Sequence, residues 1–362
     1  MCLFIQCVVT VCFIICSKEN QGQQIIYPNV KVETKTAVKM VSVFGNNDSF
    51  RSSPEDVRYN KYDKRVYVAD TEKHRIVVFD EELNYITTFG RLGQGPGEFR
   101  RPSGIAFMSD GRIVIADWGN SRYQIFDKNY QFINMFSVSS PLPTLSYYPG
   151  IDSKDRIYVN MPGNGSLFSV YDDKGSEIKS GGELMPIPID SSKNKQNWKL
   201  WYFFDSAVHY DIDETGKIYC AFINYPVLRI LSPEFNVIRE ADLSKLSTAV
   251  DRLKYWERFM KKDTGYQPKL YVKDVSLDSN YFYAMLYGDA KAFIEGNIKQ
   301  QMETFKLYAF SKDELHLEKE IMLELKDESS KDRFSPALHF DFSHEKNIYA
   351  IYFQKGIILF RK

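Results

Sequence analysis

Two short segments of this chain combine histidine and aspartate in a pattern that could do chemistry. VHYDID carries His209 two residues before Asp211, and LHFDFS repeats this arrangement with His339 and Asp341 at a shift of 130. Asp274, in VKDVS, stands at a comparable place between them. Imidazole and carboxylate groups together can hold a divalent metal ion, and a His with an Asp can act as an acid–base pair. These residues are therefore candidate ligand-binding residues, with His209 and His339 as the candidate metal ligands.

The elements that carry these residues are predicted to be strands. In both segments apolar residues alternate with polar ones, which places the His and the Asp on one face of each strand. If these are the innermost strands of a ring, their polar side chains could converge near its central channel. The competing interpretation is structural: each His bonds a nearby carboxylate or a neighbouring backbone and fixes the packing. The sequence leaves these interpretations open.

The ring itself is predicted from an internal repeat. RVYVADTEKHRIVVFDEELNYITTFG realigns on RIVIADWGNSRYQIFDKNYQFINMF with a constant shift of 47 residues. Each copy contains three apolar strands separated by turn residues, and a fourth strand such as Gly104–Met108 completes a meander. Weaker copies follow at residues 155–172, 216–232, 280–311 and 346–360. Six four-stranded units at this period predict an all-β fold, the six-bladed β-propeller.

The N-terminal segment is predicted to close the ring. The last unit runs out of chain after three strands, while VSVFG at 41–45 copies ITTFG at 86–90, the outermost strand of a blade. We therefore expect this segment to supply the missing fourth strand, which also covers an open edge. The domain boundaries that follow are a signal peptide at 1–16, a linker at 17–36 and the propeller at 37–362.

Two further repeated features are interpreted as structural. Asp70 with Arg75 and Asp117 with Arg122 occupy the same place in successive units, as expected for an ion pair across a blade turn. The glycine-rich stretch GRLGQGPGEFRRPSG lies between two strands and lacks a following GK[ST]. A phosphate loop instead leads into a helix N-terminus, so we interpret these glycines as turn residues.

The motifs YVADTEKHRIVVFD and IVIADWGNSRYQIFD, with GQGPGEFRRPSGIAF between them, resemble NHL repeats. The whole chain resembles exported six-bladed propeller lipoproteins of Gram-negative bacteria. This resemblance implies a fold and export rather than an activity. Some propeller lyases that resemble NHL proteins hold zinc with three histidines from three blades, and the five histidines of this chain are poorly placed for that site.

Insertions interrupt the repeat in the later blades. Residues 241–270 have apolar residues at helical spacing and are expected to form an amphipathic helix against the propeller. Residues 181–204 hold an aromatic cluster that includes Trp198 and Trp201. These rings either pack the inserted helix or form a platform for a sugar or apolar ligand beside the channel mouth. A third insertion, at 289–303, is polar and is the second helix candidate after 241–270.

The first sixteen residues form an uncharged apolar run that contains four of the five cysteines. The run is short for a membrane span and resembles a lipoprotein signal, with Cys16 as the lipidated residue. Ordinary secretion, a misplaced start and a retained anchor are the alternatives. Cys220 remains as the one later cysteine, so no internal disulfide is expected; within IYCAFI it is expected to be a small buried hydrophobe.

Composition narrows the choice of partner. Lys plus Arg and Asp plus Glu both number 47, so the net charge is zero and nucleic acid is not an expected partner. We expect an exported, lipid-anchored and monomeric propeller in the periplasm or at the outer membrane surface. It would bind a glycan, a peptide or an envelope protein. The alternative is a metal-assisted lyase or lactone hydrolase at the central channel, with a divalent metal as cofactor.

Overall fold

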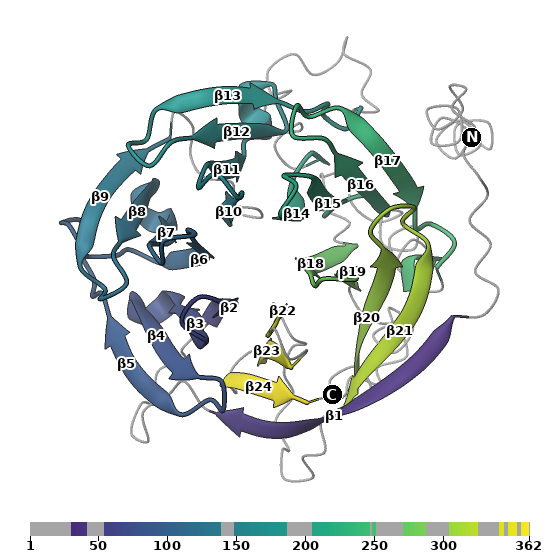
Figure 1. The fold of residues 1–362 in the computed structure, drawn as a ribbon, viewed down its shortest axis with the longest axis horizontal. Coiled ribbons are helices and arrows are strands. Elements are labelled where there is room, and N and C mark those ends of the chain that lie inside the picture. The colour runs from purple at the N-terminus through teal and green to yellow at the C-terminus, as the bar shows by residue number, and fades with distance from the viewer. Residues whose placement is uncertain are drawn as a thin grey trace, which may run out of the picture.

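The structure is a computed structural model, and it describes residues 30–41, 54–138, 148–186, 205–246, 248–250, 271–286, 304–324, 340–343, 347–352 and 356–361. In this part of the chain the strands form six blades around a common axis (Figure 1). The predicted all-β, six-bladed propeller with four-stranded blades is confirmed. No helix in the described residues is long and apolar enough to cross a membrane.

The first four blades are regular antiparallel meanders whose strands follow chain order from the axis outward. Blade 1 contains β2 (Pro54–Asn60), β3 (Arg65–Asp70), β4 (Arg75–Asp80) and β5 (Tyr85–Phe89). Blade 2 contains β6 (Pro102–Phe107), β7 (Ile113–Asp117), β8 (Arg122–Phe126) and β9 (Phe132–Ser137). Blade 3 contains β10 (Gly150–Ile151), β11 (Ile157–Asn160), β12 (Phe168–Tyr171) and β13 (Glu177–Gly181). Blade 4 contains β14 (Val208–Ile212), β15 (Ile218–Phe222), β16 (Val227–Leu231) and β17 (Val237–Asp242).

The last two blades are joined into one sheet by the N-terminal strand β1 (Lys31–Val41). Blade 5 contains β18 (Val272–Leu277), β19 (Tyr281–Leu286), β20 (Thr304–Ser311) and β21 (Leu317–Glu324). Blade 6 contains β22 (Phe340–Phe342), β23 (Ile348–Tyr352) and β24 (Gly356–Phe360), with β1 as its fourth strand. Short 3-10 helices follow the second strands of blades 1 to 3, at η1 (Thr71–Lys73), η2 (Trp118–Asn120) and η3 (Pro162–Asn164).

Strand β1 closes the ring as predicted, and it also pairs with blade 5, which the sequence did not predict. Its second half pairs antiparallel with β24, with Ala37 opposite Phe360, and so completes blade 6. Its first half pairs parallel with β21, with Lys31 opposite Lys319, and adds a fifth strand to blade 5. Figure 1 shows β1 running along the outside of both blades. The sequence assigned residues 31–36 to a linker. They form part of a strand because they run along the edge of β21 and pair with its backbone.

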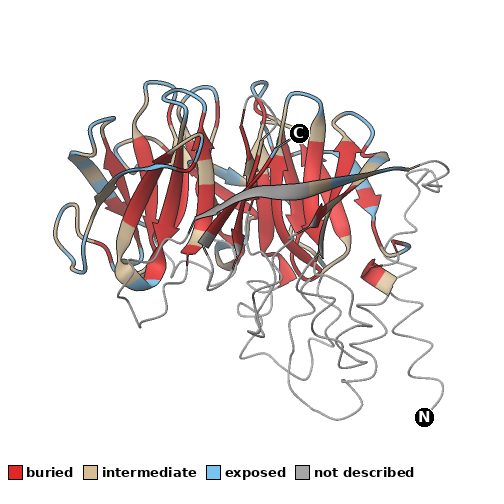
Figure 2. Ribbon diagram, turned by 90° about the horizontal axis from the view of Figure 1, so that it is seen from below, coloured by how far each residue is buried: buried red, intermediate tan, exposed pale blue. Residues whose placement is uncertain are grey.

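The hydrophobic core is divided among the six joints between neighbouring blades. Each of six buried clusters draws its side chains from two adjacent blades, such as Tyr67 with Ile105 at the joint of blades 1 and 2, and Tyr349 with Val57 at the joint of blades 6 and 1. Both faces of a blade are consequently covered, and Figure 2 shows buried strands between rims of exposed turns. This double burial explains near-continuous apolar strands such as IVIAD.

The insertions predicted for the later blades, of which 241–270 and 289–303 were expected to be helical, fall mostly outside the described residues, at 187–204, 251–270 and 289–303. The start of one of them is described. Leu243 and Leu246 are buried in the cluster between blades 4 and 5, and the backbone at 248–250 is helical. The predicted apolar contacts of this segment with the propeller therefore exist at its beginning.

Candidate functional site

The innermost strands of blades 1, 4, 5 and 6 bring charged side chains together near the ring axis. Asp211 lies on β14, Asp274 on β18 and Asp341 on β22, as the sequence suggested. Strand β2 adds Asp56 and Arg58, which sequence reasoning did not identify. Asp56 and Arg58 are two residues apart on β2 and therefore lie on the same face of that strand. The aspartates of the other three strands occupy one or the other of the two equivalent positions.

The carboxylates hold the next blade by its backbone. Each aspartate accepts a hydrogen bond from an N–H group of the neighbouring innermost strand. The bonds are Ile105 N to Asp56 Oδ2 at 2.8 Å, Leu277 N to Asp211 Oδ2 at 3.0 Å, Phe340 N to Asp274 Oδ2 at 3.0 Å and Tyr59 N to Asp341 Oδ2 at 2.8 Å. Four of the six joints are thus connected by the residue type that first suggested chemistry.

Glycine replaces these carboxylates at the other two joints. A Cβ atom on Gly104 of β6 would lie 2.9 Å from Pro149 Cδ and from Tyr148 Cα of blade 3. A Cβ atom on Gly150 of β10 would lie 2.6 Å from a ring carbon of Tyr210 in blade 4. The neighbouring blade therefore occupies the space that a side chain would need, and these joints close by direct packing.

Arg58 is the cation at the centre of this cluster. Its Nε lies 3.0 Å from Asp56 Oδ1, its Nη2 lies 3.9 Å from Asp274 Oδ1, and its guanidinium lies 5.8 Å from the ring centre of Tyr148. Burial opposes its charge, but the surrounding aspartates, with Asp211 among them, outweigh burial and raise the pKa of Arg58. The guanidinium is therefore permanently charged and offsets part of the acidic charge around it.

The aspartates titrate differently from exposed ones. Burial raises the pKa of Asp211 to about 6, against the opposing effects of Arg58 and two backbone N–H groups. Burial also raises the pKa of Asp341, where Arg58, backbone N–H groups and the Ser276 hydroxyl act in the opposite direction. Because desolvation disfavours the charged form of a carboxyl group, this cluster holds a proton more readily than the surface does.

His209 lies beside the cluster without joining a metal site. Its Nδ1 is 3.8 Å from Asp274 Oδ1, which is too long for a hydrogen bond, and its ring packs 5.7 Å from that of Tyr148. His339 lies outside the described residues. Within the described part of the chain, no three His, Cys, Asp or Glu side chains are arranged to hold a metal ion. His209, the candidate metal ligand that is described, is thus not part of a metal-binding arrangement among the described residues.

The sequence contained a signal for Asp56 and Arg58. The turn after the first strand of a blade starts at Asn60 in blade 1 and at Asp213 in blade 4. Alignment on this turn places Asp56 opposite His209, and Arg58 opposite Asp211. The correspondence of PEDVRYN is not visible when blade 1 is aligned on its later strands alone.

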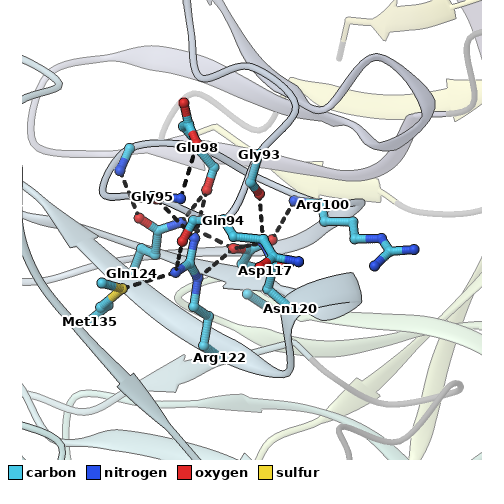
Figure 3. Close-up of polar contacts among 12 residues, drawn as sticks. Gly93, Gln94, Gly95, Glu98, Arg100, Asp117, Asn120, Arg122, Gln124 and Met135 are labelled. Atoms are coloured by element: carbon cyan, nitrogen blue, oxygen red, sulfur yellow. Dashed lines mark hydrogen bonds and ion pairs between the residues drawn. The ribbon is translucent and has the colours of Figure 1, made fainter.

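The repeated Asp–Arg pairs form ion pairs across the 3-10 turns. Arg75 Nε lies 2.8 Å from Asp70 Oδ2, and Arg122 Nε lies 2.7 Å from Asp117 Oδ2. In blade 2 the pair also holds the glycine-rich loop, as Figure 3 shows. Arg122 donates to the carbonyl groups of Gln94 at 2.6 Å, Gly95 at 3.0 Å and Glu98 at 2.9 Å.

Three glycine amides of the glycine-rich loop already donate hydrogen bonds within the protein. The Gly93 N–H bonds Phe99 O at 3.0 Å, the Gly97 N–H bonds Gln124 Oε1 at 3.0 Å, and the Gly95 N–H bonds the Glu98 carboxylate at 3.0 Å. A phosphate loop needs such amides free. The loop is a closed turn with a carboxylate of its own where an anion would bind.

An exposed surface lies on the same face of the ring as this loop. Because strands alternate in direction, the 3-10 turns and the connections between blades emerge at one face. There Arg101 stacks 5.1 Å from the ring centre of Trp118 and pairs with Glu72 at 3.0 Å. Arg100 is exposed, and its side chain points away from the loop in Figure 3. The connection that contains Trp198 and Trp201 joins β13 to β14 and starts at this face, but both residues lie outside the described residues, as does Cys16.

Cys220 is buried in β15, where burial raises the pKa of its thiol to about 12. The thiolate is the reactive form of cysteine. Cys220 therefore packs as a small apolar residue and does not supply a nucleophile.

Comparisons with known proteins agree with this architecture. A family model described as a 6-bladed beta-propeller matches residues 47–138. Protein lin-41 of Caenorhabditis elegans is 51% identical over 49 residues, which cover 14% of this chain and 4% of that protein. NHL repeat-containing protein 2 of Gallus gallus is 26% identical over 166 residues, covering 41% of this chain and 22% of that protein. This chain thus spans only a small part of the length of these relatives.

A solved structure of a putative exported protein from Bacteroides fragilis covers 92% of this chain and 99% of its own, with a TM-score of 0.52 and 10% identity. At this identity the likeness shows the fold alone. The repeat motifs, the six blades and the sequence matches lead to one conclusion. The chain is an NHL-repeat-like six-bladed β-propeller.

Proposed function

We propose that this chain is an exported, lipid-anchored propeller that binds a ligand at the cell envelope. The proposal rests on one observation: the aspartates near the ring axis bond neighbouring blades. The three aspartates that suggested chemistry, together with Asp56, each bond the backbone of a neighbouring blade, which makes them part of a rigid scaffold. A rigid ring with connections of variable length at one face suits recognition. The location follows from the expected N-terminal signal, and a putative exported protein of Bacteroides fragilis has the same fold.

The face that carries η1, η2 and the glycine-rich loop is the proposed binding face. Trp118 offers an aromatic surface, and Arg101 and Arg100 offer guanidinium groups beside it. Aromatic rings pack against sugar rings, while guanidinium groups recognise carboxylates and phosphates in a planar, bidentate way. An anionic envelope glycan is the ligand class that this combination fits best. Trp198 and Trp201, which lie outside the described residues, stay further candidates for contacts with such a ligand.

A glycan array probed with the fluorescently labelled full chain tests this proposal. Arg100→Ala and Trp118→Ala should each weaken binding to acidic glycans at least about tenfold, which corresponds to about 1.4 kcal/mol. The matched control is Tyr62→Ala, which removes a 47% exposed aromatic side chain from a turn at the opposite face. Equal loss in the control, or selective loss in a folded Trp198→Ala/Trp201→Ala variant, would move the site elsewhere. Binding to peptides alone would overturn the glycan assignment.

The lyase or lactone hydrolase alternative rests on His209 and His339. Elemental mass spectrometry of the full chain, beside the His209→Ala/His339→Ala variant, tests it directly. Near-stoichiometric metal in the parent and none in the folded variant would favour the enzyme over the binding module. The described residues supply no observation in its favour.

A further inference from the structure

The charges at the ring axis are unbalanced. Four aspartates (Asp56, Asp211, Asp274 and Asp341) act electrostatically on one arginine, Arg58, whose side chain is 15% exposed. With every group ionised, this cluster carries a net charge of about −3, the sum of four negative charges and one positive charge. Like charges in a buried site oppose full ionisation, so that one member takes up a proton first.

The hydrogen-bond donors around each aspartate indicate which member this is. Asp341 accepts three bonds, from the N–H groups of Tyr59 and Phe342 and from the Ser276 hydroxyl, each at 2.8 Å. Asp56 and Asp274 both lie near the Arg58 guanidinium, at 3.0 and 3.9 Å.

Asp211 accepts two bonds, from the backbone N–H groups of Ile212 at 2.8 Å and Leu277 at 3.0 Å. No side-chain donor among the described residues bonds its carboxylate. The ionised form of Asp211 is therefore the least compensated of the four.

We propose that Asp211 is a proton-controlled joint between blades 4 and 5, which holds the ring more firmly in mildly acidic solution than at neutral pH. The charged groups that act on it are Arg58 on β2 and Asp341 on β22, and Asp274 on β18 belongs to the same cluster around Arg58. His209 stands on its own strand, on the same face. Protonation removes one negative charge from the cluster while the second carboxyl oxygen can still accept the Leu277 N–H.

The direction of the effect follows from the raised pKa of Asp211. In the unfolded chain this carboxyl group titrates near its ordinary value of 3.8, whereas the folded protein holds the proton up to about pH 6. The folded state therefore binds more protons in this interval, and stability falls as the pH rises through it. The extra stability is fully present in acid and is lost by neutral pH.

Thermal unfolding of the full chain between about pH 5 and about pH 7.5 tests the joint. We expect the Tm of the parent to fall by several degrees over this interval. Asp211→Asn keeps an acceptor for Leu277 without the charge, so its Tm should exceed that of the parent at neutral pH and change little with pH. An equal slope in parent and variant would overturn the proposal.

Two further variants separate Asp211 from other titrating groups. Asp110→Asn removes a surface carboxyl whose pKa is lowered by its bonds to Arg112 despite partial burial, and it should keep the slope of the parent. His209→Gln should keep it as well, whereas loss of the slope in this variant would assign the effect to the histidine.

A measurement on the parent alone keeps the proposal testable if Asp211→Asn fails to fold. Infrared spectroscopy should show the C=O stretch of a protonated buried carboxyl group that disappears as the pH rises through about 6. Absence of this band at about pH 5 would overturn the proposal.

Discussion

At the residue scale, the aspartates show how one residue type can suggest chemistry and serve structure. Asp274 and Asp341 converge near the axis, as their place on predicted inner strands suggested. The sequence could not show that each faces an amide of the next blade, because that contact joins residues 66 and 282 positions apart. The signal for Arg58, whose charge offsets part of the acidic charge of the cluster, emerges only when the first strands of the blades are aligned on the turns that follow them.

Replacing Arg58 by methionine tests this balance. The substitution keeps most of the apolar stem but leaves four aspartates, of which Asp56 and Asp274 are buried, without their shared cation. Removing one partner of a buried ion pair typically costs about 3–5 kcal/mol, and we expect a loss of this size in the free energy of unfolding by urea. Adding Asp56→Asn to Arg58→Met should recover part of the loss, because it removes a carboxylate that the arginine had paired.

Arg91→Met is the matched control, since Arg91 is 81% exposed and pairs with Glu98 at the surface. Such a pair contributes less than about 1 kcal/mol. A loss for Arg58→Met no larger than that of the control would contradict the role of Arg58 at the axis.

At the element scale, the strands were predictable and the path of β1 was only half predictable. Turn residues and apolar runs locate the strands of blades 1 and 2, because both faces of each blade are buried. The fourth strand of blade 6 was predicted because residues 41–45 copy the outer strand of blade 1; the observed strand pairs through residues 37–41, and residues 42–45 lie outside the described residues. Residues 31–36 resemble no blade strand: they bond β21 through their backbone, and backbone bonding leaves no side-chain pattern to read. Likewise β10, with two residues, has too little sequence for a periodic signal.

The two halves of β1 should differ in their effect on stability. A chain that starts at Ala37 loses only the parallel strand on β21, where Val32 is 61% exposed and little apolar surface is buried. Its Tm should fall slightly from that of a reference chain that starts at Val30. A chain that starts at Asn46 also loses the fourth strand of blade 6, and its whole ring should unfold at a much lower temperature.

Differential scanning calorimetry of the three chains distinguishes the halves. The ring-closure account requires one cooperative transition that shifts strongly only in the shortest chain. Equal Tm values for the chains that start at Ala37 and Asn46 would refute it.

At the scale of the whole molecule, the ring divides into two kinds of joint. Carboxylates connect blades 4, 5, 6, 1 and 2 in succession, whereas glycines allow direct contact from blade 2 to blade 4. The N-terminal strand covers blades 5 and 6, within the carboxylate-linked arc (Figure 1). A chain that leaves the ring at Lys31 would therefore transmit a pull from an N-terminal anchor to the same arc.

The anchor itself is the last prediction. If Cys16 is lipidated, the fourteen residues from 17 to 30 connect the lipid to β1, and a chain of that length reaches at most roughly 50 Å. The propeller would stay close to the membrane while remaining folded outside it. Cys16→Ser should release the protein into the soluble fraction with an unchanged Tm, because the substituted residue lies outside the ring. Cys220→Ser controls for the loss of a thiol and should leave the protein in the membrane fraction. Membrane association that persists in Cys16→Ser would refute the lipid anchor and favour a retained N-terminal segment, whereas release identifies Cys16 as the attachment point.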